Sequence, residues 1–578
     1  MSDVLSRVFR HREDHSFSAF VKVEQDPNEL PNMLEGASLA DVKSVESAFQ
    51  GGEIFERKEL TLYGTKILAI TGTNRDSRLI YRVVEPHLDR DMKELMEFIL
   101  SHKSLLLMDT GGNEDPEKYL KKRVSSFITQ HYGYVGPDLL SRLMYYVKKE
   151  FLGAGKLDVL FADQRIEDIT VSADGEPVYV LLPGGGKGRE GYHATDIILK
   201  GDDYQSLILR VGQIAGLTPS YLTPILDGTI KSNQYRVNTV FGTQVSPAGG
   251  AFTIRSVKER PYTIGDLIAE RELNVEIAAW LWYILEKGGS GLIFGSTGSG
   301  KTTLLNAILN FVPYPKKVVV IEDTREIRLP RIMNWTAGTS RHPSTFDAAF
   351  SPIMLHDQLV AALRQRPDYI VVGEIRGEEA ETLFDAMSTG HIGYGTVHAG
   401  GLEDMMNRFA PNQSGGGSMY VPLALMNSVN FVLHVSQVML PEAGVFKKRR
   451  VLNIWENLPM EYRTTGKGAG TIAPYFVKDR DGNGLFSYNS SNDTFNGISQ
   501  GILEGYLLNW YASREGKSYE QALIDLNRRA VVLNYITAER KRLNPIDVFL
   551  ALNYYSKTKK LLDIWMPYSN DLPFDVGV

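Results

Sequence analysis

Apolar residues recur with two different spacings in the first half of the chain. Short runs rich in β-branched and aromatic residues predict strands, and longer segments with helical periodicity predict amphipathic helices. We expect strands within 42–84 and at 167–173, 177–182, 235–241 and 251–257, and helices at 89–108, 117–129, 138–152 and 204–215. This mixture, with glycine-rich turns between the elements, predicts a compact α+β domain that closes near Arg255.

From residue 265 the pattern changes to buried strands with helices between them. The apolar runs lie at 291–295, 318–323, 369–374 and 393–399. Such alternation is typical of a parallel sheet with right-handed crossovers, so the predicted fold class is α/β. Helical patterns return from Tyr519 to Lys557.

Changes in composition and in the spacing of apolar residues along the chain predict its domains. Thr263 and Asp266 form a capping-box pattern that begins a helix after a proline-containing linker. We expect a variable N-terminal region at 1–120, an α+β domain at 121–257, a linker at 258–264, an α/β domain at 265–456, and a C-terminal hairpin and helical extension at 457–578.

Composition excludes several kinds of site. The chain of 578 residues has no cysteine, which rules out disulfides, cysteine nucleophiles and thiolate zinc sites. A net charge of −6 gives no general attraction to nucleic acid, so we expect no direct nucleic-acid partner. The charged N-terminus lacks the apolar core of a signal peptide, and no apolar run is long enough to span a bilayer. We therefore expect a cytoplasmic protein that reaches a membrane only through a partner.

A glycine-rich stretch after the first buried strand of the α/β domain matches the P-loop pattern G-x-x-x-x-G-K-[ST]. Its glycines let the backbone approach phosphates closely, and the following helix N-terminus favours negative charge. Lys301 would reach the β- and γ-phosphates, and the Thr302 hydroxyl would hold Mg²⁺. We expect a nucleoside triphosphate bound through Gly295, Ser296, Thr297, Gly298, Ser299, Gly300, Lys301, Thr302 and Thr303.

Ionisable residues accompany the later strands of the same sheet. They are Glu322 and Glu326 after the second strand, Glu374 and Arg376 at the end of the third, and His391 and His398 on either side of the fourth. Ligands of such sheets bind at the carboxyl ends of strands, so these side chains are expected around one triphosphate. A carboxylate there can orient or deprotonate the attacking water. Taken singly, each residue is also compatible with a solvated strand end or a structural histidine.

The segments GSTGSGKT, IEDTREIRLP, LRQRPDYIVVGEIRG and STGHIGYGTVHAG occur in this order. They resemble the four signatures of the secretion ATPase superfamily: Walker A, the Asp box, an atypical Walker B ending in Gly-Glu, and the His box. The segments FLGAGKLDVLFADQRIEDITV, YRVN, AFTIRS, ERPYTIGDLI, NDTF and RRAVVLNYI resemble its archaeal branch. The resemblance covers roughly residues 120–560 and implies a RecA-like ATPase domain preceded by a PAS-like α+β domain. It also implies ATP and Mg²⁺ as cofactors.

The resemblance implies roles for single residues. Glu326 or Glu322 would be the catalytic carboxylate of the Asp box, and the sequence leaves both open. Glu374 would be the Walker B glutamate beside Mg²⁺, and His398 would sense the γ-phosphate. The usual Walker B aspartate is replaced by Gly373, so the threonine of the P-loop and water would carry more of the metal binding.

Three arginines match family arginines that approach the phosphates: Arg364, Arg236 and Arg255. The last two lie in the domain before the P-loop and would act across domains or subunits. An ordinary arginine on a strand surface explains these two equally well.

By resemblance, we expect a homo-hexameric ATP hydrolase on the cytoplasmic face of a membrane. It would act on a polytopic membrane platform protein, and through it on pilin-like subunits, to assemble a type IV pilus or archaellum or to secrete protein. Alternatives are a conjugation-type DNA or protein transfer ATPase and a nucleic-acid translocase with a RecA-like core. The four-cysteine zinc module of many bacterial relatives is absent, which favours an archaeal-type member.

Two further motifs have structural interpretations. The segment DRDGNG (479–484) resembles half of a calcium loop, but Ser490 stands where the loop needs glutamate, so a hairpin turn is the preferred interpretation. The basic run at 447–450 precedes an apolar strand and is interpreted as a solvated edge rather than a lipid or nucleic-acid site.

Overall fold

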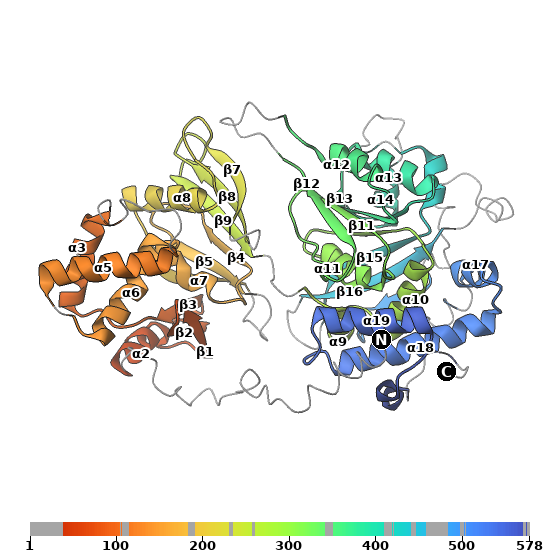
Figure 1. Ribbon diagram of the computed structural model, residues 1–578, viewed down its shortest axis with the longest axis horizontal. Helices are drawn as coiled ribbons and strands as arrows, with labels where there is room; N and C mark the ends of the chain where they lie inside the picture. Colours follow the sequence, from red (N-terminus) through yellow and green to blue (C-terminus); the bar gives the residue numbers. More distant parts are fainter. Residues whose placement is uncertain are drawn as a thin grey trace. The chain divides into compact units, whose positions relative to one another are not determined.

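The computed structural model describes the chain as two compact units that divide between residues 258 and 259 (Figure 1). The described residues are 39–103, 106, 115–133, 135–182, 191–230, 235–256, 261–341, 351–409, 419, 421–440, 447–457, 484–496, 502, 505–569 and 574. Among them, no helix combines the length and apolar character needed to cross a bilayer. The expected calcium-like motif lies outside the described residues except for Gly484, and the expected linker is described only from Pro261 onward.

The first unit is built on one nine-stranded sheet in the order β1-β2-β3-β6-β5-β4-β9-β8-β7. Its strands are β1 (Ile54–Leu62), β2 (Thr65–Thr73), β3 (Leu79–Val84), β4 (Asp168–Val171), β5 (Pro177–Leu182), β6 (Gly191–Ile198), β7 (Ile225–Ile230), β8 (Tyr235–Phe241) and β9 (Gly250–Ser256). Its helices are α2 (Leu39–Glu46), η1 (Ser47–Phe49), α3 (Arg90–Ser101), α5 (Pro116–Tyr132), α6 (Pro137–Phe151), η2 (Gly155–Leu157), α7 (Asp158–Phe161) and α8 (Asp202–Ile214). Neighbouring strands are antiparallel, except for the parallel pair β3 and β6.

The strands of the N-terminal region share their sheet and core with the α+β domain. Leu60, Ile67 and Tyr81 are buried in one cluster with Ile169 and Val180. The boundary expected at residue 120 therefore does not coincide with a break in the sheet. The physical reason is that one face of β1–β3 packs into this shared core, while the other face is covered by α2 and η1.

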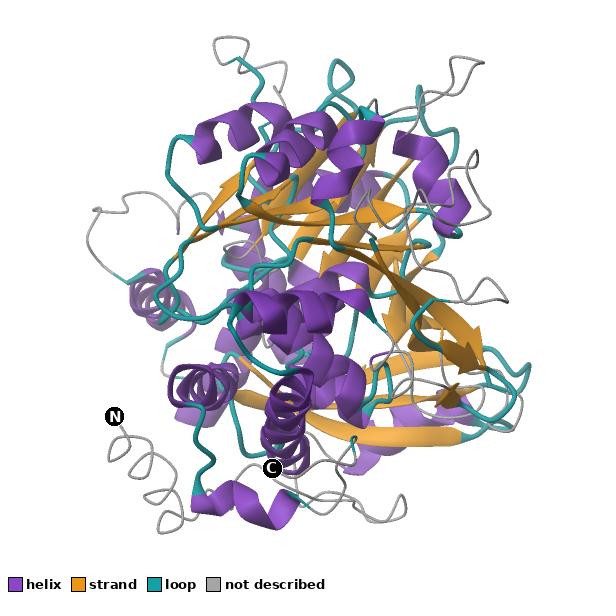
Figure 2. Cartoon of the chain, turned by 90° about the vertical axis from the view of Figure 1, so that its right-hand side faces the viewer, coloured by secondary structure: helices purple, strands orange, loops and turns teal. Residues whose placement is uncertain are grey.

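The second unit contains a seven-stranded sheet in the order β12-β11-β13-β14-β10-β15-β16, with helices on both sides (Figure 2). Its strands are β10 (Gly291–Gly295), β11 (Val318–Glu322), β12 (Trp335–Thr339), β13 (Tyr369–Ile375), β14 (Ile392–His398), β15 (Phe431–Met439) and β16 (Lys447–Glu456). Its helices are α9 (Ile264–Ala269), α10 (Val275–Glu286), α11 (Lys301–Ile308), η3 (Leu309–Phe311), α12 (Leu355–Leu363), α13 (Glu379–Ser388), α14 (Leu402–Phe409) and η4 (Leu423–Ser428). Within this sheet β15 and β16 are antiparallel, and the other described strand pairs are parallel. The predicted α/β fold with a mostly parallel sheet is confirmed.

Local sequence signals explain parts of this unit well. The capping box is confirmed, because Asp266 N donates to Thr263 Oγ1 and Thr263 N donates to Asp266 Oδ2 at the start of α9. The four predicted strands are β10, β11, β13 and β14, whose residues are almost all buried. The edge strand β12 is half-exposed and lacks a continuous apolar run, which is why the pattern did not reveal it.

The solvated basic edge expected at 447–450 is wrong for Arg450. This side chain is 3% exposed, and its Nε and Nη2 donate to Asp493 Oδ1 and Oδ2 at 2.7 and 2.9 Å. The Tyr488 hydroxyl also donates to Asp493 Oδ1 at 2.7 Å. These bonds attach a small hairpin, β17 (Ser487–Asn489) and β18 (Thr494–Asn496), to β16. Successive side chains of a strand point to opposite faces, and Arg450 lies on the face of β16 that the hairpin covers. A run of consecutive basic residues in the sequence does not show which of them is covered.

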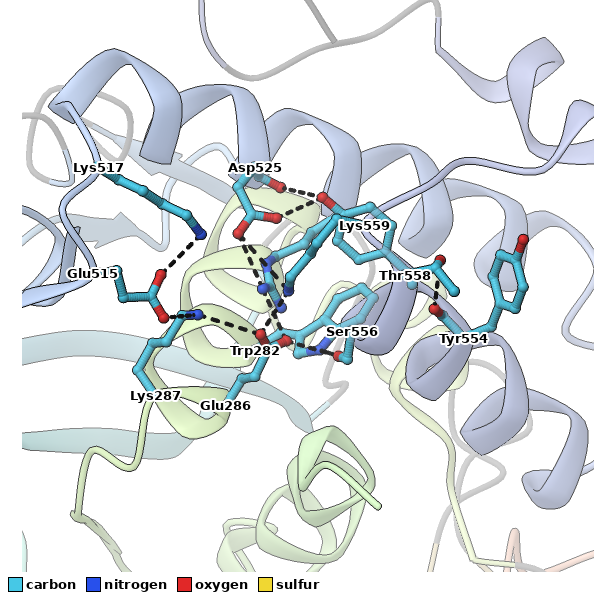
Figure 3. Close-up of polar contacts among 12 residues, drawn as sticks. Trp282, Glu286, Lys287, Glu515, Lys517, Asp525, Tyr554, Ser556, Thr558 and Lys559 are labelled. Carbon is cyan, nitrogen blue, oxygen red and sulfur yellow. Dashed lines mark hydrogen bonds and ion pairs between the residues drawn. The ribbon is translucent and has the colours of Figure 1, made fainter. Parts of the chain in front are cut away.

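The C-terminal helices pack onto the second unit rather than forming a separate body. They are α17 (Tyr506–Arg514), α18 (Tyr519–Ala538), α19 (Pro545–Thr558) and η7 (Asp563–Tyr568). A buried charge network joins α10 to α18 and α19 (Figure 3). Arg529 is fully buried, with Nη2 2.9 Å from Glu286 and 3.3 Å from Asp525, and Lys559 Nζ lies 2.6 Å from Glu286. Burial alone would raise the pKa of Glu286, but Arg529 and Lys559 lower it to about 2.

Replacing Arg529 with alanine is expected to destabilise the second unit by about 3–5 kcal/mol, because it leaves two buried carboxylates without their main partner. The midpoint of denaturant-induced unfolding measures this change. Arg528 on the same helix is half-buried outside this network, so Arg528→Ala is the matched control and should cost far less. Equal losses from both variants would contradict the interpretation.

Candidate nucleotide-binding and catalytic site

The turn between β10 and α11 has the conformation that a phosphate-binding loop needs. Gly298 and Gly300 have φ angles of 75° and 99°, which favour glycine. A Cβ atom at Gly295 would lie 2.0 Å from the carbonyl oxygen of Val435. Gly300 is the N-cap of α11 and offers no capping side chain, so the first N–H groups of the helix remain available for a ligand.

Polar groups inside this loop fit an anionic ligand. Lys301 Nζ donates to the carbonyl oxygens of Gly295 and Ser296 at 3.1 and 2.9 Å. Burial lowers the pKa of Lys301 to about 8, while the negative charges of Glu374 and Glu326 act in the opposite direction. Both carboxylates are therefore close enough to influence this ammonium group. Phosphate oxygens could replace the two carbonyl partners at lower electrostatic cost.

Ser299 provides a second indication of fit. The residue is fully buried, and its Oγ has no hydrogen-bond partner among the described residues. A buried hydroxyl without a partner costs free energy. A bound phosphate oxygen would supply that partner.

Parallel register brings the strand ends together at one edge of the sheet. Gly295 pairs with His398 across β10 and β14, and Ile375 pairs with Val397 across β13 and β14. Glu374 therefore lies near the end of β13, beside the strand end that carries His398. This is the edge at which ligands of parallel sheets bind.

Glu322 and Glu326 occupy different environments. Glu322 is 2% exposed, and its Oε1 accepts hydrogen bonds from the backbone N–H groups of Glu326 and Ile327 at 3.0 and 2.9 Å. Burial raises the pKa of Glu322 to about 7, and these two bonds partly offset the shift. Glu326 is exposed. The same loop is held at its other end by Arg328 N, which donates to Asn306 Oδ1 on α11 at 2.9 Å.

The glycine at the atypical Walker B position is explained by this packing. A Cβ atom at Gly373 would lie 2.8 Å from Glu322 Cγ. Thr396 Oγ1 also donates to the carbonyl oxygen of Gly373 at 2.6 Å, which fixes β13 against β14. An aspartate at this position would displace Glu322 and so disturb the loop that carries Glu326.

His398 contacts both the P-loop and the end of β13. Its Nδ1 lies 3.3 Å from Thr297 Oγ1 and 3.5 Å from Lys301 Nζ, and its Nε2 lies 3.6 Å from Glu374 Oε1. Burial lowers the pKa of His398, and the nearby positive charges of Lys301, Arg408 and Arg376 lower it further. A neutral imidazole is therefore favoured at this position.

Arg376 links two neighbouring strand ends. Its guanidinium forms an ion pair with Asp323 after β11 and lies 4.0 Å from Glu374 Oε2. Glu379 Oε1 on α13 accepts from the backbone N–H groups of Arg376 and Gly377 at 2.6 and 2.8 Å. Glu379 and Asn306 both hold loops of the site, because their side-chain oxygens accept hydrogen bonds from backbone N–H groups of those loops. Sequence reasoning missed both, because no local pattern distinguishes such a residue from an ordinary helix residue.

Two residues expected at the site lie elsewhere. His391 precedes β14, at the opposite end from His398, and its Nδ1 lies 3.2 Å from the carbonyl oxygen of Ala386. Arg364 is the C-cap of α12 and is exposed. It precedes β13, so it lies at the amino edge of the sheet, and the fold of this unit does not bring it to the P-loop.

Arg236 and Arg255 belong to the first unit. They are directly opposite each other on the antiparallel strands β8 and β9. Arg255 also pairs in register with Asp168 on β4, and its Nε lies 3.0 Å from Asp168 Oδ1. Two arginines at opposed positions repel each other, and the aspartate offsets this cost. The three side chains therefore form a row across one face of the sheet.

The residues expected to hold Mg²⁺ supply oxygen ligands only. Thr302 is half-buried in the first turn of α11, and Glu374 lies near the end of β13. Among the described residues, no group of three histidines or carboxylates gathers as a separate metal cage. A hydroxyl and one carboxylate are sufficient for Mg²⁺, which usually binds with water and substrate phosphates.

Comparison with known families and sequences finds one matching family and several proteins of similar sequence. Residues 229–458 match the family described as Type II/IV secretion system protein. The chain is 34% identical over 324 residues to Uncharacterized protein MJ0900 of Methanocaldococcus jannaschii, which covers 55% of this chain and 54% of that protein. It is 37% identical over 268 residues to Uncharacterized protein MJ1287 of the same organism, covering 46% and 89%. It is 33% identical over 179 residues to Type IV secretion system protein PtlH of Bordetella pertussis, covering 30% and 51%. The chain thus spans about half the length of the first of these relatives.

Two solved structures are similar to this chain. The Legionella pneumophila ATPase DotB has 19% identity, covers 62% of this chain and 87% of its own, and gives a TM-score of 0.35. The pilus retraction motor PilT with bound ADP has 19% identity, covers 65% and 96%, and also gives 0.35.

Proposed function

This chain belongs to the type II/IV secretion ATPase superfamily, and from that membership we propose that it hydrolyses ATP to drive filament assembly or protein secretion. We propose the following partners. The chain would act as a homo-hexamer on a polytopic membrane platform protein at the cytoplasmic face of a membrane. Pilin-like subunits would be moved indirectly, as in assembly of a type IV pilus or archaellum.

One observation supports hydrolysis above all others. His398 contacts the P-loop through Thr297 and Lys301, and contacts Glu374 on the neighbouring strand. A P-loop, a carboxylate and a neutral imidazole thus meet where the γ-phosphate of a bound triphosphate would lie. Phosphoryl transfer requires mainly such positioning and charge neutralisation.

We assign the water-orienting role to Glu326 rather than to Glu322. Glu322 is buried and accepts two backbone hydrogen bonds, whereas Glu326 is exposed and its charge acts on Lys301. Glu326 would accept a proton from the attacking water, whose oxygen forms a bond to the γ-phosphorus. The bond from that phosphorus to the β–γ bridging oxygen breaks, and ADP and phosphate leave.

The other residues of the site would bind and neutralise charge. Lys301 and the N–H groups of the P-loop would hold the β- and γ-phosphates. Thr302 and Glu374, the latter through water, would hold Mg²⁺, which neutralises phosphate charge when bound. His398 would donate to the γ-phosphate and lose this contact after hydrolysis. Arg236 and Arg255 would supply positive charge from a neighbouring subunit.

Hydrolysis measured with and without single-stranded DNA tests this proposal. We expect the purified full chain to hydrolyse Mg-ATP, and we expect single-stranded DNA to leave the rate unchanged, because the chain has a net charge of −6. A nucleic-acid translocase would instead be stimulated several-fold. Absence of hydrolysis under all conditions would contradict the proposed activity.

A conjugation-type transfer ATPase is the second candidate. It is favoured by 29% identity over 300 residues to the Putative conjugal transfer protein Rv3659c of Mycobacterium tuberculosis, of which this chain covers 82%. Stimulation by double-stranded or single-stranded DNA would favour this candidate over a filament-assembly motor.

A further inference from the structure

The strand pair β15–β16 extends past the P-loop strand. Residues of β10 pair with β15 only as far as Phe294 and His434, but β15 continues to Met439 and remains paired with β16. The overhanging part of this two-stranded ribbon lies alongside the P-loop. In Figure 1, β15 and β16 are labelled close to α11, the helix that follows the loop.

Two residues that face each other on this ribbon both contact the P-loop. Gln437 on β15 pairs in register with Arg449 on β16. Gln437 Nε2 donates to the carbonyl oxygen of Gly298 at 2.9 Å. A Cβ atom at Gly300 would lie 2.9 Å from Arg449 Cδ and 3.5 Å from its Nε. The two side chains thus line the loop from Gly298 to the start of α11.

The guanidinium of Arg449 interacts with Glu272 through its charge alone. Among the described residues, its guanidinium forms no hydrogen bond and no ion pair, although it lies beside a loop suited to bind phosphate. Its neighbours on the opposite face of β16 are both paired: Arg450 binds Asp493, and Lys448 Nζ lies 3.9 Å from Glu270. An unpaired arginine beside a helix N-terminus raises the local positive potential for an anion.

A buried carboxylate lies beside the same loop. Glu272 is 4% exposed, and its Oε1 has no hydrogen-bond partner among the described residues. The same atom would lie 3.4 Å from a Cβ atom at Gly300. Burial raises the pKa of Glu272 to about 7, and the charges of Arg449 and Arg450 act against this shift. Glu272 therefore lies within electrostatic reach of Arg449 without a hydrogen bond to it, which leaves the guanidinium N–H groups for a ligand.

The position of the ribbon indicates which part of the nucleotide it meets. The strands that carry Glu326, Glu374 and His398 lie on one side of β10, and the ribbon lies on the other. The γ-phosphate must face the catalytic carboxylates. The non-transferred phosphates and the nucleoside therefore point toward the ribbon.

We propose that Gln437 and Arg449 form the nucleoside side of the triphosphate site. Gln437 fixes the P-loop backbone through Gly298, and Arg449 binds the phosphates that ATP and ADP share. This inference rests on the proposed function, because it needs a nucleotide in the P-loop. Since both nucleotides retain these phosphates, Arg449 contributes to affinity for each of them and little to the chemical step.

The test measures binding of Mg-ADP to the full chain by calorimetry, and hydrolysis at saturating ATP. Arg449→Gln is expected to weaken ADP binding about 10- to 100-fold, the range for a lost charge-assisted contact, with kcat within about threefold of wild type. Arg449→Lys keeps the charge and should recover part of the affinity. Lys448→Gln, on the opposite face of the same strand, should bind ADP as wild type does. Equal thermal midpoints would show that all variants are folded.

Three outcomes would overturn the inference. They are unchanged ADP affinity in Arg449→Gln, an Arg449→Lys variant as weak as Arg449→Gln, and a fall in kcat without a change in affinity. If the wild-type chain itself binds neither ADP nor ATP, the proposed function fails, and this inference fails with it. If wild type binds ADP and Arg449→Gln binds it equally well, only the proposed role of Arg449 is excluded.

Discussion

Replacing Lys301 with alanine is expected to remove nucleotide binding from this chain. The ammonium group lies inside the P-loop, where it donates to the carbonyl oxygens of Gly295 and Ser296. Contacts to two phosphate groups are worth about 1.5–3 kcal/mol each, so ATP and ADP should bind about 10²–10⁴-fold more weakly. Calorimetric titration with each nucleotide measures the change.

A lysine far from the loop provides the control. Lys316 Nζ pairs with Asp368 at 2.7 Å at the opposite edge of the sheet, and half of its side chain is exposed. Lys316→Ala should therefore bind both nucleotides as wild type does. Tight binding of ATP by a folded Lys301→Ala variant would show that the nucleotide site lies elsewhere.

The second large effect separates the two glutamates of the Asp box. Glu326→Gln is expected to reduce turnover about 10²–10⁴-fold while ATP still binds, because the amide cannot accept the proton of the attacking water. Glu322→Gln is expected to keep most of the turnover, because its amide oxygen can still accept from the N–H groups of Glu326 and Ile327. Steady-state hydrolysis and nucleotide affinity of both variants distinguish binding from chemistry.

Two controls accompany this comparison. Glu322→Ala removes the acceptor and should lower turnover, because the loop that carries Glu326 loses its anchor. The stability of Glu322→Gln relative to wild type should also increase between about pH 4.5 and 7. Burial raises the pKa of Glu322 from 4.5 to about 7 in the folded state, so the unfolded chain ionises first, and the contribution of Glu322 to stability falls across this window and stays constant at higher pH. Glutamine cannot ionise and does not suffer this loss. Full turnover in Glu326→Gln would exclude Glu326 as the base.

Much of the second unit could be predicted from local patterns. The strand, glycine-rich turn and helix around Lys301 follow from an apolar run, positive-φ glycines and helical periodicity in adjacent segments. The capping box at Thr263 is equally local, because its two hydrogen bonds join residues three apart. Parallel sheets also collect the ends of their strands at one edge, so a meeting of Glu374 with His398 could be expected from their order alone.

Other expectations failed because they depended on which end or face of an element a residue occupies. Placing His391 at the site was wrong, since it stands at the start of β14 rather than at its end. The solvated role expected for Arg450 was wrong, since alternation turns it toward Asp493. The domain boundary predicted at residue 120 separated the N-terminal strands from the α+β domain, whereas pairing between distant segments joins them in one sheet.

The sequence by itself determined the elements whose causes are local: the P-loop turn, the buried strands around it, the helix caps and the family to which these motifs belong. Only the tertiary structure decided how the ionisable residues are used. Glu322 and Glu326 are the same residue type four positions apart, yet packing buries one beneath Gly373 and leaves the other exposed. Arg449 and Arg450 are adjacent, yet one faces the P-loop and the other a hairpin. Burial and pairing depend on segments far away in the chain, so they set the pKa and the partners of a side chain in a way that no local pattern encodes.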